Sequence, residues 1–413
     1  MCRDCAMKLT VSYVPIFVAR IGSGASAFLV VKLASGGHLE AGVVLAAYPF
    51  LEALGALIAG RWSDTLGRKK TLVVGYVVRS LAMLMLAWAF FTHTSPVLEA
   101  FLNGVIGLTT AFILTASLTM ATDLTEVKNR GVGMGGFEFI NLASYGVGYL
   151  IGSALYTLFK GPAAYLTIAI VTALATPIFA KFLIETRPVA PVGGKFLLSV
   201  LPPSAVVLLP VWFALTTIIG LGMFAPRVLQ VSRETSSIAE SIVGRLGESL
   251  IVGVLFIGAL SLLGVGAIFF GRLADRWGRV KTFRLGLVGG LAALLVLNIA
   301  LHLGLGPLES IALTAPLLFL TSAIGPSILA LIGDEADIRY RGTTMGIYSV
   351  VLGLGIGIGS LLGGAISSIS RQYAINGLAT AALGVYVVMT TIHILLAKTY
   401  KTYVKDTIFV ATR

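Results

Sequence analysis

The sequence is poor in charged residues, in histidine and in cysteine. Only 12% of its 413 residues are Asp, Glu, Lys or Arg, and it has four histidines and two cysteines. Soluble domains carry about 25% charged residues, so this composition excludes an ordinary soluble protein. Cys2 and Cys5 form a C-x-x-C pair, which can be a redox pair or half of a zinc site. No second pair follows and the histidines are scattered, so we expect no metal and no cofactor.

The sequence also lacks the motifs of two large protein classes. It has no G-x-x-x-x-G-K-[ST] loop for nucleotide phosphates, which argues against ATP as an energy source. It shows no combination of nucleophile, base and orienting residue, and no metal cluster, that would indicate an enzyme. We therefore expect a protein that is not an enzyme.

Long apolar runs are what the sequence has instead. Hydrophobic residues make up 57% of the chain, and the mean hydropathy is +0.96. Apolar runs of about 20 residues or more are long enough to cross the hydrocarbon core of a bilayer. In lipid such segments must be helical, because nothing else satisfies their backbone groups. We expect the first run to remain as a span rather than to be removed as a signal peptide.

The pattern predicts an all-α membrane protein with twelve transmembrane helices. The predicted spans are 10–34, 41–60, 71–91, 98–121, 132–158, 163–184, 205–226, 249–270, 282–303, 310–332, 343–369 and 376–397. The net charge of +12 could indicate a nucleic-acid partner, but the charges lie in short loops between spans. Positive loops face the cytoplasm, so we expect a plasma-membrane protein with both termini cytoplasmic.

Two pairs of loops repeat with one offset. The segment GRWSDTLGRKK at 60–70 recurs as GRLADRWGRVK at 271–281, a separation of 211 residues (271 minus 60). At the same offset, Asp123 and Arg130 recur as Asp334 and Arg341. The chain is therefore a tandem repeat. We predict an N-terminal bundle at 1–184, a cytoplasmic linker rich in Pro and Gly at 185–204, and a C-terminal bundle with its tail at 205–413.

Two six-span halves joined by a linker resemble the major facilitator superfamily. The repeated loop is similar to that family's signature, G-x-L-x-D-r-x-G-r-k, between spans 2 and 3 and between spans 8 and 9. The first copy departs from it at Trp62 and Thr65. The resemblance covers essentially the whole chain. It implies two pseudo-symmetric six-helix bundles, a small-molecule substrate, a coupling ion such as H⁺, and a monomer that works by alternating access.

Each position of the repeated motif has a physical role to fill. Its first glycines, Gly60 and Gly271, let a helix end pass close to a neighbour, and its second glycines allow a turn. Its aspartates can accept hydrogen bonds from the following arginine or from a neighbouring helix N-terminus. Its arginines can pair across the halves, and the family resemblance implies that such contacts latch the cytoplasmic side when the protein is open outward. The alternative is that these are topology charges alone. The remaining predicted latch residues are Asp64, Gly67, Arg68, Asp275, Gly278, Arg279, Asp123, Arg130, Asp334 and Arg341.

Three ionisable residues lie inside predicted spans of the N-terminal half. Arg20, Glu52 and Glu138 each sit about 12–15 Å from the cytoplasmic edge at 1.5 Å per residue. Ionisable groups at this depth are costly and indicate function. We predict that Arg20 pairs with Glu52, with Glu138 or with both, and that one carboxylate is a protonation site. The alternatives are a fixed structural ion pair and direct contact with a charged substrate.

The other polar residues within spans suggest weaker hypotheses. Asn103, Asn141 and Tyr145 are candidates to line a cavity, or else to form interhelical hydrogen bonds. We expect Arg79 to reach the membrane interface and His393 to be structural. Proton-linked members of the family often have an arginine where this chain has Asn103, and drug-efflux members have a proline that its span 5 lacks.

These features predict a secondary transporter that exports a fairly hydrophobic organic compound. The runner-up is proton-coupled uptake of an organic anion or nutrient, with Arg20 as the counter-ion. A third reading is a membrane receptor or scaffold that has kept the fold and lost transport. Intact copies of both loops argue against it, because a protein that does not move needs no latch.

Overall fold

The computed structural model describes residues 3–35, 38–159, 161–186, 203–223, 248–337, 339–369 and 374–411. All regular elements in these ranges are helices. They are α1 (Arg3–Leu33), α2 (His38–Thr65), α3 (Arg68–Phe91), α4 (Pro96–Asp123), the 3₁₀ helix η1 (Val127–Asn129), α5 (Arg130–Phe159), α6 (Pro162–Phe182), α7 (Pro203–Gly222), α10 (Glu248–Trp277), α11 (Arg279–His302), α12 (Pro307–Thr321), α13 (Ile324–Glu335), α14 (Arg341–Ile369) and α15 (Ala374–Ala411).

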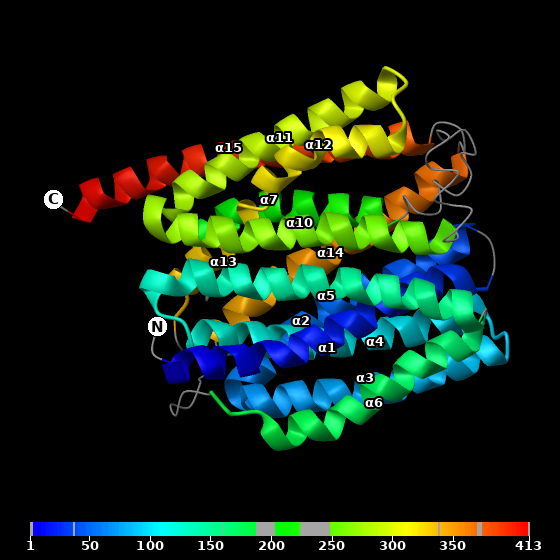
Figure 1. Cartoon of the computed structure of the whole chain (residues 1–413). Coiled ribbons are helices and arrows are strands. Elements are labelled where there is room, and N and C mark those ends of the chain that lie inside the picture. Colours follow the sequence, from blue (N-terminus) through cyan, green and yellow to red (C-terminus); the bar gives the residue numbers. More distant parts are fainter. Residues whose placement is uncertain are drawn as a thin grey trace.

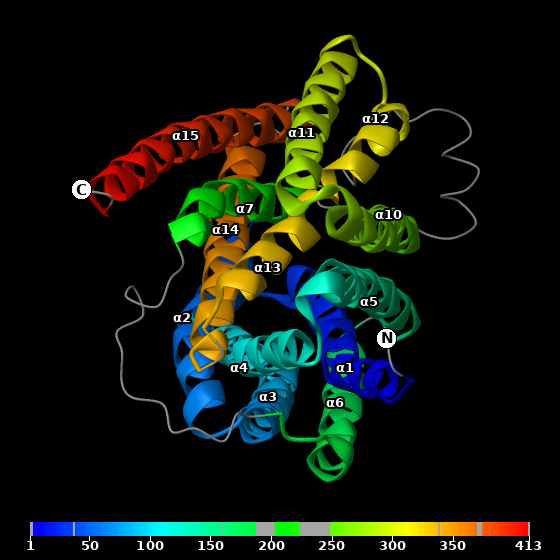
Figure 2. The same ribbon diagram turned by 90° about the vertical axis from the view of Figure 1, so that its left-hand side faces the viewer.

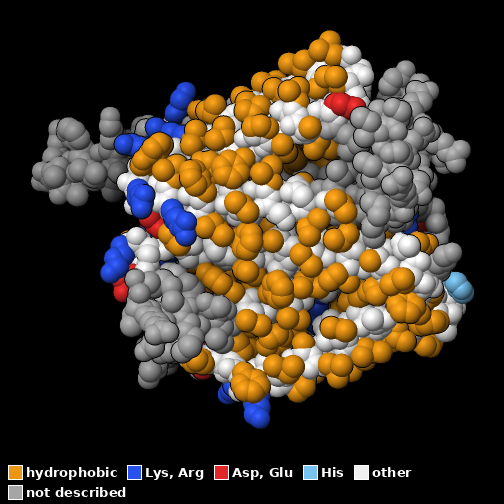
Figure 3. All heavy atoms as spheres, viewed as in Figure 1, with side chains coloured by type: hydrophobic (Ala, Val, Ile, Leu, Met, Phe, Trp, Pro, Cys, Tyr) orange, Lys and Arg blue, Asp and Glu red, His pale blue; other side chains and the backbone are white. Residues whose placement is uncertain are grey.

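The predicted spans correspond to these helices. Among the described residues, eleven helical stretches are long and apolar enough to cross a membrane, and Val206–Gly222 is a shorter apolar helix. The predicted seventh span, 205–226, extends beyond residue 223 and so partly lies outside the described residues. Figure 3 shows hydrophobic side chains over the middle of the molecule, whereas basic and acidic side chains gather mainly at its left edge. The all-α membrane fold is confirmed.

The helices form two groups that correspond to the two halves of the sequence. In Figure 1 the helices of the first half, blue to green, occupy the lower part, and α10, α11, α12 and α15 occupy the upper part. Figure 2 shows the same division from the end of the bundle. Both chain ends lie at the end where α2 passes into α3 and α10 passes into α11. Most of the predicted linker, residues 187–202, lies outside the described residues, so the domain boundaries stay predictions.

Two pairs of helices, α2 with α14 and α5 with α10, make the most extensive contacts between the halves among the described residues. Glycines allow the close approach. A Cβ atom on Gly60 would lie 2.9 Å from the carbonyl oxygen of Gly342, and one on Gly131 would lie 2.5 Å from that of Gly271. Small residues let helix backbones pack closely in a membrane. A larger residue at either of the motif's first glycines would therefore crowd the backbone of the facing helix.

The repeated motif is mostly helical, which corrects its prediction as a loop. Helix α2 continues to Thr65 and α3 starts at Arg68; α10 continues to Trp277 and α11 starts at Arg279. Each junction turns on a glycine with positive φ, 110° at Gly67 and 96° at Gly278. A side chain at such a φ is strained, which is the physical reason for glycine at both junctions.

The predicted span 310–332 is interrupted near its middle. Helix α12 ends at Thr321 and α13 starts at Ile324, with short-range bonds from the amides of Ser322 and Ala323 back to Phe319 and Leu320. Pro326 explains the break, because its ring clashes with the carbonyl four residues earlier, that of Ser322. The break puts irregular backbone inside the bundle, where it is tolerated only against protein or a cavity.

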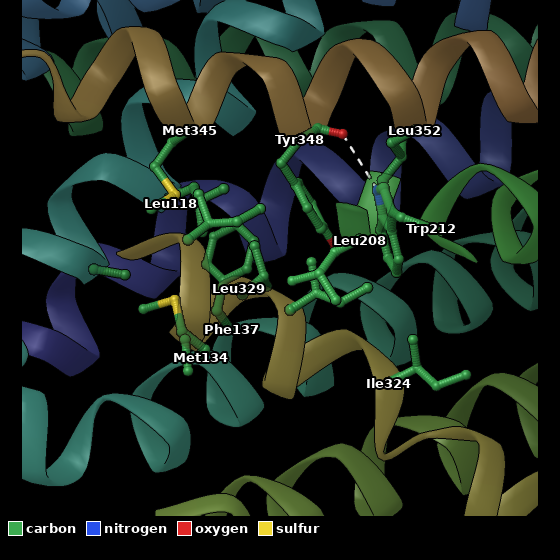
Figure 4. Packing of buried hydrophobic residues seen from close by; sticks show 14 of the residues in the cluster. Leu118, Met134, Phe137, Leu208, Trp212, Ile324, Leu329, Met345, Tyr348 and Leu352 are labelled. Atoms are coloured by element: carbon green, nitrogen blue, oxygen red, sulfur yellow. Dashed lines mark hydrogen bonds between the residues drawn. The ribbon is translucent and has the colours of Figure 1, made fainter. Parts of the chain in front are cut away.

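A large hydrophobic cluster packs between the halves. Figure 4 shows Phe137 of α5 and Leu329 of α13 near Met345 and Tyr348 of α14. Trp212 of α7 stacks on Tyr348 with ring centroids 4.4 Å apart. Its indole N–H also donates to the Tyr348 carbonyl at 3.3 Å. This cluster gives the polar groups described below an apolar, water-poor surrounding.

Close packing of α1 on α5 predicts the effect of a single methyl group. A Cβ on Gly148 would meet the backbone of Ile21, 2.8 Å from its Cα, whereas a Cβ on Gly258 meets nothing within 4 Å. We expect Gly148→Ala to lower stability by about 1–3 kcal/mol through overpacking. Gly258→Ala, the matched control, should be neutral or stabilising, because alanine is the better helix former. Thermal unfolding of the purified variants measures both. Equal melting temperatures would contradict this packing.

Candidate functional site

The first aspartate of the motif binds the N-terminus of a helix from the other half. Asp64, at the end of α2, accepts from the amides of Gly342 and Thr343 at 2.9 and 2.8 Å. The Thr343 hydroxyl donates a third bond at 2.7 Å. Backbone amides in the first turn of a helix have no helical partner, and the helix dipole favours a carboxylate there. This contact joins α2 to α14.

The second aspartate makes the equivalent contact in the opposite direction. Asp275, at the end of α10, accepts from the amides of Gly131 and Val132, both at 2.9 Å. These residues start α5, so the contact joins α10 to α5. We call the Asp64 and Asp275 contacts together the latch, and the end of the molecule that carries them the signature side.

Ion pairs surround each latch contact. Asp123 receives Arg68 from its own half at 3.2 Å and Arg341 from the other half at 3.1 Å. Asp334 receives Arg279 from its own half at 2.5 Å and Arg130 from the other half at 2.6 Å.

The partners differ from the prediction. Arg68 pairs within its own half, so its expected pairing across the halves is wrong. Arg279 reaches the other half through a bond to the Val127 carbonyl at 2.9 Å. The crossing ion pairs come instead from Arg130 and Arg341, the first residues of α5 and α14. A geometric reason is that the motif arginine follows its glycine turn and therefore lies against the adjacent helix end of its own half.

A second polar cluster lies within the spans of the N-terminal half. Arg20 on α1 forms a 3.3 Å ion pair with Glu52 on α2. Its Nε also donates to the Asn141 side chain on α5 at 2.6 Å. All three side chains are buried. Of the pairings left open by the sequence, the structure therefore contains Arg20 with Glu52.

Glu138 has a different set of neighbours. The Tyr348 hydroxyl of α14 donates to its carboxylate, and Gly325 beside the helix break lies close to it. Among the described residues no Lys or Arg lies within ion-pair distance of Glu138. The bond between Glu138 and Tyr348 crosses from one half to the other at a buried position. Sequence analysis missed Tyr348, because its partner Glu138 lies 210 residues away in the sequence and nothing in the spacing brings the two together.

Arg79 corrects another expectation. It was expected at the membrane interface but is fully buried, and it bonds Thr110, Ser23 and the Ala19 carbonyl. It lies 11 residues after Arg68 (79 minus 68), about 16 Å along the helix. That is too deep for the side chain to reach the headgroups. The criterion that made Arg20 a functional candidate, its depth within a predicted span, applies to Arg79 as well.

The remaining candidates divide between cavity and packing roles. Asn103 donates to the Val44 carbonyl at 2.8 Å, an interhelical bond. It also borders a small cavity of about 30 Å³ together with Arg20, Glu52 and Tyr145. That volume holds about one water molecule. Cys2 lies outside the described residues.

A larger cavity, called the central cavity below, has Glu138 in its wall. It measures about 130 Å³ and is mostly apolar. Its wall includes Glu138, Trp212 and Leu263, with Tyr386 and the residues around the helix break. Drug-sized ligands occupy about 300–1,000 Å³, so this volume accommodates only part of such a molecule. A single carboxyl in an apolar wall suits an amphipathic ligand with a positive charge.

The two helices whose N-termini are held by the latch, α5 and α14, also carry Glu138 and Tyr348. Helix α5 is held at Gly131 and Val132 and carries Glu138 about two turns further on. Helix α14 is held at Gly342 and Thr343 and carries Tyr348 at a similar distance. The two latched helices therefore meet at the Glu138–Tyr348 bond.

Two groups of apolar helices, joined by reciprocal contacts on one side and enclosing buried charges, form the arrangement of a helical membrane transporter. The Major Facilitator Superfamily model matches residues 13–321 and 246–405. The chain belongs to this family, and it is a multi-pass membrane protein.

Two curated relatives come from Bacillus subtilis (strain 168). Multidrug resistance protein 2 is 31% identical over 142 residues, which are 33% of this chain and 33% of that protein. Multidrug resistance protein 1 is 25% identical over 153 residues, 36% of this chain and 37% of that protein. The similarity therefore spans about a third of each relative's length.

Solved structures share the fold over most of the chain. The human organic anion transporter MFSD10 (TETRAN) has a TM-score of 0.72 and 16% identity, covering 93% of this chain and 98% of that one. A bacterial homologue of the iron transporter ferroportin, in an outward-facing state with soaked iron, has a TM-score of 0.68 and 17% identity, covering 94% and 99%. At these identities the likeness shows the fold alone.

The ion pairs around Asp334 predict a stability difference between two aspartates. Asp334→Asn removes the charge that Arg130 and Arg279 share. Breaking a fully buried pair costs about 3–5 kcal/mol, and we expect a smaller loss here because Asp334 is only partly buried. Asp337 pairs with Arg339 on the surface, where a pair contributes about 0–1 kcal/mol. We expect Asp334→Asn to unfold at a clearly lower temperature than wild type, and Asp337→Asn to unfold as wild type does. Equal effects of the two substitutions would contradict the network.

Proposed function

We propose that the protein exports a fairly hydrophobic organic cation across the plasma membrane in exchange for H⁺, with Glu138 as the shared site. The position of Glu138 carries this proposal. It lies at the wall of the apolar cavity and bonds across the halves to Tyr348. The partial similarity to two multidrug resistance proteins supports an efflux role.

Glu138 can serve either a proton or a cation. An ionised carboxylate in an apolar cavity is costly unless a positive charge accompanies it. A lipophilic cation in the cavity would supply that charge, and a proton would replace it. Because one carboxylate cannot hold both, binding of one displaces the other, which is what exchange of substrate for proton requires.

Arg20 and Arg79 stay charged, so the net charge of the site changes when Glu138 gains or loses a proton. Arg20 is balanced by Glu52, and Arg79 bonds neutral oxygens. With Glu138 ionised, the positive charges of Arg20 and Arg79 equal in number the negative charges of Glu52 and Glu138. Protonation of Glu138 leaves one positive charge in excess, which opposes entry of a cation.

Helices α5 and α14 connect Glu138 and Tyr348 to the latch on the signature side. A change at Glu138 alters its bond to Tyr348, and the helices carrying both residues start at the latch. We propose that the halves rock about the central site, closing the signature side when the latch forms. The signature side carries most of the basic loop residues, so we assign it to the cytoplasm. One chain contains both halves, and we propose a monomer.

The uptake hypothesis fits the structure less well. Arg20 is already bound to Glu52 and Asn141, and the cavity beside it measures about 30 Å³. An organic anion would have to displace Glu52 and enlarge that space. The scaffold hypothesis leaves the cavity and the reciprocal latch without a purpose.

Binding of a lipophilic fluorescent cation to purified protein tests the proposal. We expect wild type to bind the cation at least about tenfold more tightly at about pH 7.5 than at about pH 5.5, because deprotonated Glu138 binds it. Glu138→Gln should bind more weakly and with no pH dependence. Tyr348→Phe keeps the carboxyl and should keep the pH dependence.

Glu126→Gln is the matched control, since it removes a carboxyl that is exposed and outside the cavity. Organic anions, sugars and amino acids serve as competitors in the same assay. Wild-type pH dependence in Glu138→Gln would refute the exchange mechanism. Tight binding of an organic anion that is lost in Arg20→Ala would favour uptake instead.

A further inference from the structure

A groove runs between α11 and α15 on the outside of the C-terminal half. The two helices lie side by side at the top of Figure 1. The groove has a volume of about 640 Å³, several times that of the central cavity. Its apolar walls are formed by one face of each helix. They comprise Leu287, Val288, Leu291, Tyr386, Val387, Ile394 and Ala397.

The two charged residues of the groove lie toward one end. Arg284 lies near the start of α11 and Lys398 in the later part of α15, and both line the groove. The helices run in opposite directions, so these two positions lie toward the signature side. Leu291 and Tyr386 lie further along each helix, toward the middle of the membrane. None of the lining residues is acidic.

The inner wall of the groove is fixed by bonds to its neighbours. His393 bonds the Val207 carbonyl of α7 at 2.7 Å and meets the Phe283 ring edge-on. The Tyr386 hydroxyl donates to the Leu287 carbonyl at 2.8 Å. These contacts tie α15 to α7 and α11, so the groove is a formed surface rather than a loose gap.

We propose that this groove binds one anionic phospholipid from the leaflet on the signature side. Two cations at the mouth match a phosphate-bearing headgroup, and basic pockets between transmembrane helices suit anionic lipid headgroups. The apolar floor beyond them matches an acyl chain. The order along the membrane normal, charge outside and hydrocarbon inside, is that of a lipid standing in its own leaflet.

The charges distinguish a lipid from the proposed substrate. A lipophilic cation would be repelled by Arg284 and Lys398, whereas Glu138 in the central cavity would attract it. The two cavities therefore suit ligands of opposite charge. They share a wall residue, Tyr386. A lipid in the groove packs on one side of this ring and so restricts its movement into the central cavity.

Native mass spectrometry of the full chain in detergent measures lipid binding without reference to transport. The probes are phosphatidylglycerol and phosphatidylcholine with identical acyl chains. We expect wild type to retain one phosphatidylglycerol with at least about a tenfold preference, because each basic residue near the surface contributes to the attraction. Arg284→Gln/Lys398→Gln should lose that preference. Arg284→Lys/Lys398→Arg should keep it.

Two further variants separate this site from general charge effects. Lys69→Gln/Lys70→Gln removes the same charge from the signature side of the other half and should leave the preference unchanged. Leu291→Trp fills the apolar part of the groove and leaves Arg284 and Lys398 in place. It should weaken phosphatidylglycerol binding.

Three results would overturn the proposal. They are an unchanged preference in Arg284→Gln/Lys398→Gln, an equal loss in Lys69→Gln/Lys70→Gln, and equal competition by glycerophosphoglycerol, which has the headgroup but no acyl chains. The last result would identify a site for a free phosphate compound rather than for a membrane lipid. Failure of cation export would leave these outcomes unaffected.

Discussion

Each half of this protein holds the start of a helix from the other half with one carboxylate. Asp64 binds the first amides of α14, and Asp275 binds those of α5. The bonds use amides that a helix leaves unsatisfied at its N-terminus, so the contact needs no side-chain partner on the opposing helix. Its strength depends on the exact approach of two helix ends, and the motif's glycines permit that approach.

The ion pairs on the signature side follow the same reciprocal arrangement. Asp123 and Asp334 each bind one arginine of their own half and one of the other. Charged contacts at the edge of a membrane can exchange bonds with water as they open, whereas the apolar contacts between halves cannot. Closure by a few directional bonds is therefore compatible with repeated opening. The same helices carry Glu138 and Tyr348, which places the proposed site of proton exchange on the elements that the latch holds.

The sequence allowed the fold to be predicted because its signals were strong and repeated. The offset between Gly60 and Gly271 fixed the two halves, and the runs between charged loops fixed the spans. The break before Pro326 was missed because proline alone does not determine whether a helix bends or stops. Within the site, burial cost identified Arg20, Glu52 and Glu138 as members of one layer.

The partners of those residues could not be predicted in the same way. Choosing Glu52 over Glu138 for Arg20 requires knowing which faces of α1, α2 and α5 meet, and single-residue spacing does not give that. Tyr348 contributes through a hydroxyl on an otherwise apolar side chain and lies far from Glu138 in the sequence. Arg68 and Arg279 were expected to cross the halves because the turn that directs each toward its own half was read as an open loop.

The distance between the halves on the signature side tests the latch most directly. Spin labels at Leu66→Cys and Val280→Cys, both exposed positions, in a background with Cys2→Ser and Cys5→Ser, report that distance by electron paramagnetic resonance. The account predicts one dominant short distance in the otherwise native chain, and a shift of population to longer distances in Asp64→Asn/Asp275→Asn. An unchanged distance distribution in that double variant would show that the two carboxylates do not hold the signature side closed.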